Sequence, residues 1–159
     1  MHTSSEPIKA NPSVAMSEHA ASFNIPLTEY KFMTRNELTA WEVEFTEEFE
    51  AWWHTLTEEE QISLDASVRL LEILGPALGF PHSSGIFGSR HAHMRELRTQ
   101  YKGRPLRTLY AFDPRRTAIL LIGGDKTGND RWYDEFVSRA DSLYDEHLRQ
   151  LMNEGLLNG

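Results

Sequence analysis

The spacing of two arginines, Arg98 and Arg107, is the feature of this sequence that most directly indicates a binding or catalytic site. Lys102 and Gly103 between them have the composition of a hairpin turn, and counting outward from that turn places Arg98 opposite Arg107 on one face of two paired strands. At about 5 Å, two like charges repel by about 0.8 kcal/mol in water and by about 3 kcal/mol at an effective dielectric of about 20. Such a pair either binds an anion or is neutralised by Glu96, which shares the face. A one-residue shift of the turn would undo this pairing.

Three further residues have side chains that can move protons or contact a phosphate. His93 forms a His-x-His pair with His91, but a metal site would need a third ligand that the sequence does not define. His93 could instead be a proton donor, a phosphate contact or a structural histidine, and the sequence does not choose among these roles. Lys126 lies in the glycine-rich segment 123–129, whose backbone can approach a ligand closely. Tyr133 follows in the first turn of a helix, where it either joins the core or points its hydroxyl into a cleft.

Three consecutive strands would position these residues. Alternation and turn residues predict strands at 94–101, 105–112 and 117–124, joined by turns at 102–103 and 113–116. This order is typical of a compact antiparallel meander.

One further strand and three helices are expected around the meander. Residues 41–45 alternate apolar and acidic side chains, so they predict a fourth strand of the same sheet. A helix is expected at 47–56, capped by Thr46, and a second helix starts with the capping box 57–60 and ends at Gly75. A Gly/Ser loop follows at 80–92. The last helix is capped by Asn129 or Asp130 and runs to about Asn153.

The charge distribution is uneven along the chain. The whole sequence of 159 residues has a net charge of −8, but residues 90–116 hold eight basic and two acidic side chains. A local excess of basic charge framed by acidic helices is typical of a confined anion site; the alternative is that helices and sheet neutralise one another across their packing faces.

Composition and length narrow the class of protein. The absence of cysteine excludes disulfides, thiolate zinc sites and thiol nucleophiles. No nucleotide or cofactor motif is found, and no apolar run reaches the length of a membrane span, so we expect a cytoplasmic protein without a cofactor or bound metal. We predict a flexible extension at 1–38, with a possible docked strand at 23–32, one α+β domain at 39–153 and a tail at 154–159.

Several motifs, in this order, resemble one family of bacterial and phage proteins. They are WEVEFTEEFEAWW, HMRELR, GRPLR, LYAFDPRR, AILLIGGDKTG and RWYDEFVSRADSLYDEHL. Together they span about 110 residues and are similar to toxins of the RelE/ParE superfamily, in its HigB-like, phage-type branch. The resemblance implies a small twisted antiparallel sheet of about four strands with two N-terminal helices and one C-terminal helix. It also implies a ribosome-dependent mRNA endoribonuclease without a cofactor, inhibited by a HigA-like helix-turn-helix antitoxin.

The resemblance also assigns roles by position. Arg107 matches the arginine that stabilises the transition state, and Arg98 matches a second strand arginine. Lys126 matches the basic residue after the last strand, and Tyr133 the tyrosine that acts as a base or stacks on the nucleotide. Relatives that use a lysine pair would carry it at Met94 and Glu96, where this sequence has none.

Metal-free RNA cleavage requires a base, cations on the phosphate and an acid. Tyr133 or Glu96 is the candidate base and Lys126 or His93 the candidate acid. Tyrosine could act as a base only if neighbouring cations lowered its pKa from about 10. The predicted RNA contacts are Arg95, Arg98, Arg104 and Arg107.

Two other functions fit the same sequence. One is a ParE-like inhibitor of DNA gyrase, in which Arg107, Lys126 and Tyr133 need not converge on one site. The other is a binding module with the same fold and no catalysis, which the missing lysines favour.

Overall fold

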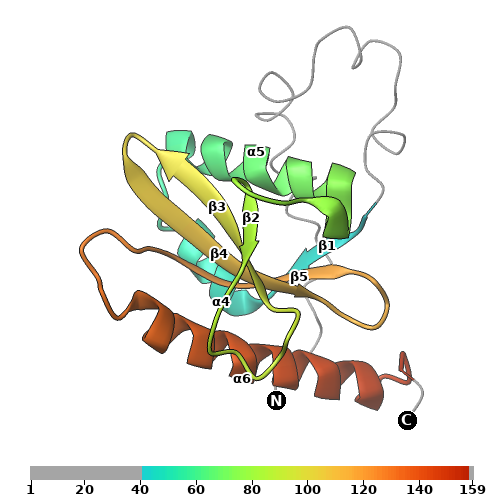
Figure 1. The fold of residues 1–159 in the computed structure, drawn as a ribbon. Coiled ribbons are helices and arrows are strands. Elements are labelled where there is room, and N and C mark those ends of the chain that lie inside the picture. The colour runs from blue at the N-terminus through green and yellow to red at the C-terminus, as the bar shows by residue number, and fades with distance from the viewer. Residues whose placement is uncertain (1–40, 158–159) are drawn as a thin grey trace, which may run out of the picture.

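The computed structural model of the protein describes residues 41–157. The predicted extension at 1–38, including its possible strand, lies outside these residues. The described chain folds in the order β1 (Val43–Phe45), α4 (Glu47–Trp53), α5 (Glu58–Leu74), the short 3₁₀-helix η2 (Gly75–Ala77), β2 (Ser83–Gly85), β3 (Arg95–Tyr101), β4 (Arg104–Phe112), β5 (Ala118–Asp125) and α6 (Trp132–Asn153) (Figure 1).

The strands form one sheet in the order β1-β5-β4-β3-β2. The antiparallel meander of β3, β4 and β5 confirms the prediction, and so does its register, in which Arg98 pairs with Arg107. The α+β fold class is confirmed as well, although the sheet has five strands and is mixed, because β1 runs parallel to β5. An alternating pattern predicts a strand but not its direction. The fifth strand, β2, lies in the segment 80–92, for which the sequence predicts a loop, because three small residues give no alternating pattern.

Helices cover both faces of the sheet. Helices α4 and α5 pack on one face and α6 on the other, so that the sheet lies between two helical layers (Figure 1). Each interface has its own buried core. The α4/α5 side is filled by Val43, Phe49, Leu64, Val68, Leu71, Leu97, Tyr110 and Leu120, and the α6 side by Met94, Leu109, Ala111, Ile119, Leu121, Trp132, Val137, Ala140, Leu143 and Tyr144.

The helix starts follow the capping rules at two of three positions. The Thr46 hydroxyl accepts a hydrogen bond from the N–H of Phe49, and Thr57 and Glu60 form the predicted capping box. Helix α4 ends at Trp53 and is shorter than predicted. The prediction that Asn129 or Asp130 caps the last helix is wrong, because α6 begins at Trp132 and its N-cap makes no side-chain capping bond. The Asn129 side chain instead accepts from the N–H of Arg131, at 3.0 Å.

Two glycines at the end of β5 make room for aromatic rings. A Cβ atom on Gly123 would lie 2.2 Å from the ring of Trp52, and one on Gly124 would lie 2.9 Å from the rings of Trp132 and Phe136. These glycines were predicted to let the backbone approach a ligand. In the structure they belong to β5, and the groups that approach their backbone are side chains of α4 and α6.

Replacement of Gly123 by alanine is expected to lower the free energy of unfolding by about 1–3 kcal/mol, because the added methyl group overlaps the Trp52 ring. Urea denaturation measures this change. Gly79→Ala is the matched control, since a Cβ there meets nothing within 4 Å. Equal stability of the two variants would contradict the tight packing of Trp52.

Candidate active site

Glu96 lies at the centre of a polar cluster formed by β3, β4 and α6. Its Oε1 accepts a hydrogen bond from the Tyr133 hydroxyl at 2.6 Å, and its Oε2 accepts from Arg98 at 3.0 Å and from the Ser84 hydroxyl at 2.7 Å. Arg107 Nε lies 3.7 Å from Glu96 Oε1, and the side chains of both residues are 5% exposed. One carboxylate, two guanidinium groups and a phenol thus share one site.

The start of α6 brings two more of the predicted residues to this cluster. Gly124 pairs with Arg107, and the rings of Trp132 and Phe136 pack over its bare backbone. This packing holds the first turn of α6 against the sheet next to Arg107, so that Tyr133 reaches Glu96. Lys126 Nζ lies 5.4 Å from the centroid of the Tyr133 ring. The predicted residues Glu96, Arg98, Arg107, Lys126 and Tyr133 are therefore neighbours.

The environment of Tyr133 opposes its use as a base. Burial raises the pKa of Tyr133 above the ordinary value of 10.0, and the hydrogen bond to Glu96 and the negative charge of that group raise it further, whereas Arg107 lowers it by less. A general base must be deprotonated before it can accept a proton, but this phenol keeps its proton and donates a hydrogen bond to Glu96. Tyr133 is thus a hydrogen-bond donor in this structure.

We expect the Tyr133 hydroxyl to ionise with a pKa above the ordinary value of 10.0. The folded state favours the neutral phenol, so its contribution to stability is present below pH 10 and is lost as the pH rises through the folded pKa. Ultraviolet absorbance of phenolate, compared between the wild type and Tyr133→Phe, isolates this titration. In Glu96→Gln the titration should move toward 10, and ionisation of Tyr133 below pH 10 would contradict the assignment.

Arg107 contains a buried donor without a hydrogen bond. Within residues 41–157, its Nε has no hydrogen-bond partner, and its Nη1 donates to the carbonyl of Leu106 at 3.0 Å. Buried polar groups are rarely left without a hydrogen-bond partner, and a catalytic role or a bound ion is one explanation of an exception. The Nε–H of Arg107, which lies 3.7 Å from Glu96 Oε1, is thus a candidate donor to an anionic oxygen of a ligand.

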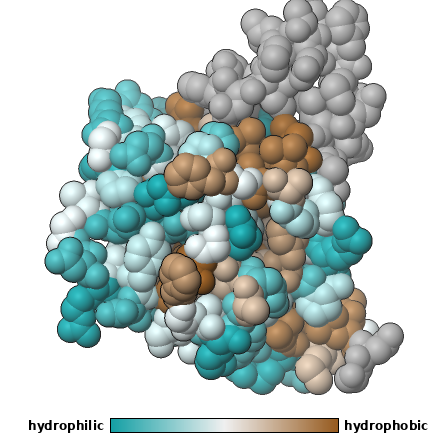
Figure 2. Space-filling model, in the orientation of Figure 1, coloured by the Kyte–Doolittle hydropathy of each residue, from teal (hydrophilic) through white to brown (hydrophobic). Residues whose placement is uncertain are grey.

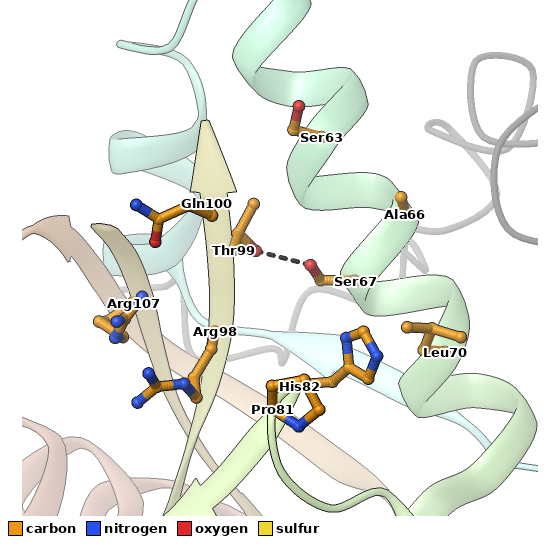
Figure 3. Close-up of a pocket in the computed structure, with 10 residues that line it drawn as sticks. All are labelled: Ser63, Ala66, Ser67, Leu70, Pro81, His82, Arg98, Thr99, Gln100 and Arg107. Atoms are coloured by element: carbon orange, nitrogen blue, oxygen red, sulfur yellow. Dashed lines mark hydrogen bonds between the residues drawn. The ribbon is translucent and has the colours of Figure 1, made fainter. Parts of the chain in front are cut away.

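A cleft of about 470 Å³ opens beside these arginines. Arg98 and Arg107 lie on one side of β3 and α5 lies on the other, with the hydrogen bond between Ser67 and Thr99 bridging strand and helix (Figure 3). The lining residues are Ser63, Ala66, Ser67, Leu70, Pro81, His82, Arg98, Thr99, Gln100 and Arg107. The end of the molecule at the β3–β4 hairpin is mainly hydrophilic, whereas apolar side chains gather near the C-terminal end of α5 (Figure 2). The cleft thus offers two cations and neutral polar groups to a ligand.

The other two arginines predicted to bind RNA contact a different set of groups. Arg95 donates to the Ser83 hydroxyl at 2.9 Å. Arg104 forms ion pairs with Glu60 of α5 and with Asp125. Since side chains alternate along a strand, Arg95 faces away from Arg98, and Arg104 faces away from Arg107. The structure does not bring them to Glu96, and their contact with RNA stays a prediction.

His93 belongs to a second polar cluster. Its Nε2 lies 3.3 Å from the Tyr144 hydroxyl, and its ring is near that of His91, which pairs with Asp145. None of the residues around Glu96 is among these partners. The role of His93 as an acid or phosphate contact stays a prediction.

Within residues 41–157, no group of three or more His, Asp or Glu side chains is arranged to hold a metal ion. No helix in this range is long and apolar enough to cross a membrane.

Sequence reasoning did not identify three residues at the site. Ser84 donates to Glu96, and His82 lines the cleft next to Pro81. Phe80 lies against Arg98. All three come from the segment 80–92, whose position beside β3 depends on the short strand β2. The serine and glycine content of this segment indicated only a loop.

Comparison with known proteins assigns a family to this fold and site. Residues 51–145 match the model of the phage-derived Gp49-like protein family, so the chain belongs to that family. It is also similar to two proteins of Mycobacterium tuberculosis, named "Putative toxin HigB2" and "Putative toxin HigB3". These matches confirm the resemblance to the HigB-like, phage-type branch of the RelE/ParE superfamily.

The extent of each match differs. The chain is 44% identical to HigB2 over 106 residues, which cover 65% of the chain and 53% of HigB2. It is 43% identical to HigB3 over 100 residues, which cover 62% of the chain and 86% of HigB3. The chain thus spans about half the length of the first relative and most of the second. No solved structure matches it significantly.

Proposed function

We propose that the protein is the toxin of a type II toxin–antitoxin system and acts as a ribosome-dependent mRNA endoribonuclease. The observation that carries the proposal is the convergence of a carboxylate, two arginines, a lysine and a tyrosine in one cluster, of which the two arginines also line a cleft. A base, cationic phosphate ligands and an acid are the groups that RNA cleavage through the ribose 2′-hydroxyl requires. The names of the HigB relatives support the toxin class.

In the proposed reaction, Glu96 is the general base. Its carboxylate takes the proton of a 2′-hydroxyl, and the 2′-oxygen forms a bond to the adjacent phosphorus. Arg98 and the free Nε–H of Arg107 then bind the negative charge that develops on the phosphate oxygens. Breakage of the bond from phosphorus to the 5′-oxygen leaves a 2′,3′-cyclic phosphate on one product.

Tyr133 is the proposed general acid. Because its pKa is raised, the phenol is protonated before the reaction and can give its proton to the leaving 5′-oxygen. Lys126 lies over the Tyr133 ring and stabilises the phenolate that this step forms. The second product then carries a 5′-hydroxyl group.

The same geometry bears on the two alternative functions. An inhibitor of gyrase acts by protein–protein contact and does not require Arg107, Lys126 and Tyr133 to be neighbours, so their convergence favours a nuclease. The non-catalytic module was suggested by the missing lysines at Met94 and Glu96. The Met94 side chain is 1% exposed in the core beneath α6. In the proposed reaction the Glu96 carboxylate takes the role of the base.

The proposal also defines the partners. The toxin would act on mRNA in the ribosome, and therefore in the cytoplasm, and a HigA-like helix-turn-helix antitoxin would inhibit it. The excess basic charge of the segment 90–116 would face the RNA and would make binding sensitive to salt.

The test is to induce the chain without antitoxin in bacteria and to map mRNA 5′ ends. We expect growth arrest and new 5′-hydroxyl ends inside reading frames. When a translation-initiation inhibitor is added first, these ends should be absent, because the mRNA is no longer in ribosomes.

The alternatives give different results in the same cells. Arrest with relaxed plasmid DNA and no new mRNA ends would indicate a gyrase inhibitor. Unimpaired growth with soluble, folded protein would indicate a binding module.

A further inference from the structure

Phe80 is a large apolar side chain exposed beside the candidate active site. It is 77% exposed, whereas Leu78, two residues earlier, is 2% exposed in the core. Single apolar side chains on a surface are common and by themselves indicate nothing. The environment of Phe80 is what distinguishes it.

The ring of Phe80 lies against one of the two arginines of the site. The Cζ atom of Arg98 is 5.2 Å from the ring centroid, which is a cation–π contact. The following residues, Pro81 and His82, line the cleft together with Arg98 and Arg107 (Figure 3). Phe80 therefore lies next to the residues that line the cleft and in contact with one of its two arginines.

Backbone hydrogen bonds fix this segment next to β3. The carbonyl of His82 accepts from the N–H of Arg98 at 2.8 Å, which ties the segment to the strand that carries the arginine. The N–H groups of His82 and Ser83 both donate to the carbonyl of Gly79 at 3.0 Å, which closes a turn around Phe80. The main chain that carries the ring is thus fixed beside Arg98, although no core packs around the ring.

Resting on the proposed nuclease function, we infer that Phe80 is the stacking platform for one unpaired base of the RNA whose phosphate lies on Arg98 and Arg107. The phosphate group of a nucleotide at these arginines brings an adjacent base within reach of a ring beside them. Aromatic side chains bind unstacked bases through their faces, with little preference for sequence. Phe80 then acts in substrate binding and takes no part in proton transfer.

The test is binding of two short RNA analogues that the protein cannot cleave. One is a fluorescent hexamer of mixed sequence with 2′-O-methyl riboses, and the other has the same backbone with every base removed. We expect the wild type to bind the base-containing hexamer about tenfold more tightly, by anisotropy at low salt. Phe80→Ala should lose this preference, and Phe80→Trp should retain it.

Two matched variants separate stacking from other effects. Phe87→Ala removes another exposed phenylalanine of the same segment, 95% exposed, and should keep the preference for bases. Arg107→Ala should weaken binding of both hexamers by the same factor, because it removes a phosphate contact. If Phe80 only positioned Arg98, Phe80→Ala would likewise weaken both hexamers equally, and that result would overturn the inference.

The remaining outcomes distinguish a failure of the stacking inference from a failure of the proposed nuclease function. Binding that depends on Arg107 and is unchanged in Phe80→Ala would overturn the stacking role and leave the nuclease proposal standing. Failure of the wild type to bind either hexamer would overturn the stacking role, and the mapping of mRNA ends in cells would then decide the nuclease proposal separately.

Discussion

Replacement of Arg107 by alanine is expected to lower the rate of mRNA cleavage by about 10²- to 10³-fold. Loss of one preorganised donor to the charge of a transition state typically has an effect of this size. Arg107 is almost fully buried and its Nε–H makes no hydrogen bond within the described residues, and its loss would leave Arg98 as the remaining guanidinium group at Glu96. Single-turnover cleavage of mRNA on programmed ribosomes measures the rate.

The structure suggests two controls for this experiment. Arg107→Lys keeps the charge without the planar guanidinium group and should recover only part of the rate. Arg139→Ala removes a half-exposed arginine of α6 that pairs with Glu48, and should leave the rate unchanged. Glu96 keeps its hydrogen bonds to Ser84, Arg98 and Tyr133 in Arg107→Ala, so we expect a folded variant by circular dichroism. A folded variant with the wild-type rate would place the chemistry elsewhere.

The arginine pair could be predicted because a local turn determines it. Lys102 and Gly103 have φ angles of 48° and 79°, the left-handed pair that a two-residue hairpin requires. Once the turn is placed, the pairing of Arg98 with Arg107 follows by counting residues, and Glu96 follows by alternation. The capping box at Thr57 is equally local, since its two hydrogen bonds join residues three apart.

Features that depend on distant parts of the chain could not be predicted in this way. The contact of Tyr133 with Glu96 joins residues 37 apart in sequence, and the burial that raises the pKa of Tyr133 comes from that packing. A bulge between Leu109 and Tyr110 sets which glycine of β5 lies beside Arg107. The strand β2, which brings Ser84 and Phe80 to the site, is too short to leave a periodic pattern. The sequence thus defined the cations of the site but not how their neighbours are arranged.

Asp113 likewise has a local role that the sequence predicts and a long-range role that it does not. Its sequence context predicts only a turn. Its side chain is fully buried, and it accepts hydrogen bonds from His147 at 2.9 Å, from the guanidinium of Arg115 at 2.7 and 2.9 Å, and from the N–H of Thr117 at 3.2 Å. It thus joins the β4–β5 turn to α6. Burial alone would raise the pKa of Asp113, but the hydrogen bonds from His147 and Arg115 and the charge of Arg115 together lower it below 3.8.

Asp113→Ala is therefore expected to lower the free energy of unfolding at pH 7 by about 1–3 kcal/mol, because it leaves the buried His147 without its partner and Arg115 with Glu44 alone. Since the folded pKa is lowered, the charged Asp113 stabilises the fold above the unfolded pKa, and this contribution disappears as the pH falls through the folded pKa. Urea denaturation at pH 7 and at about pH 3 should thus show a smaller difference between wild type and variant at the lower pH. Asp134→Asn, at an exposed position of α6, should change stability little at either pH. An equal loss of stability at both pH values would mean that the effect of Asp113→Ala comes from packing. That result would contradict a stabilising role of the Asp113 charge.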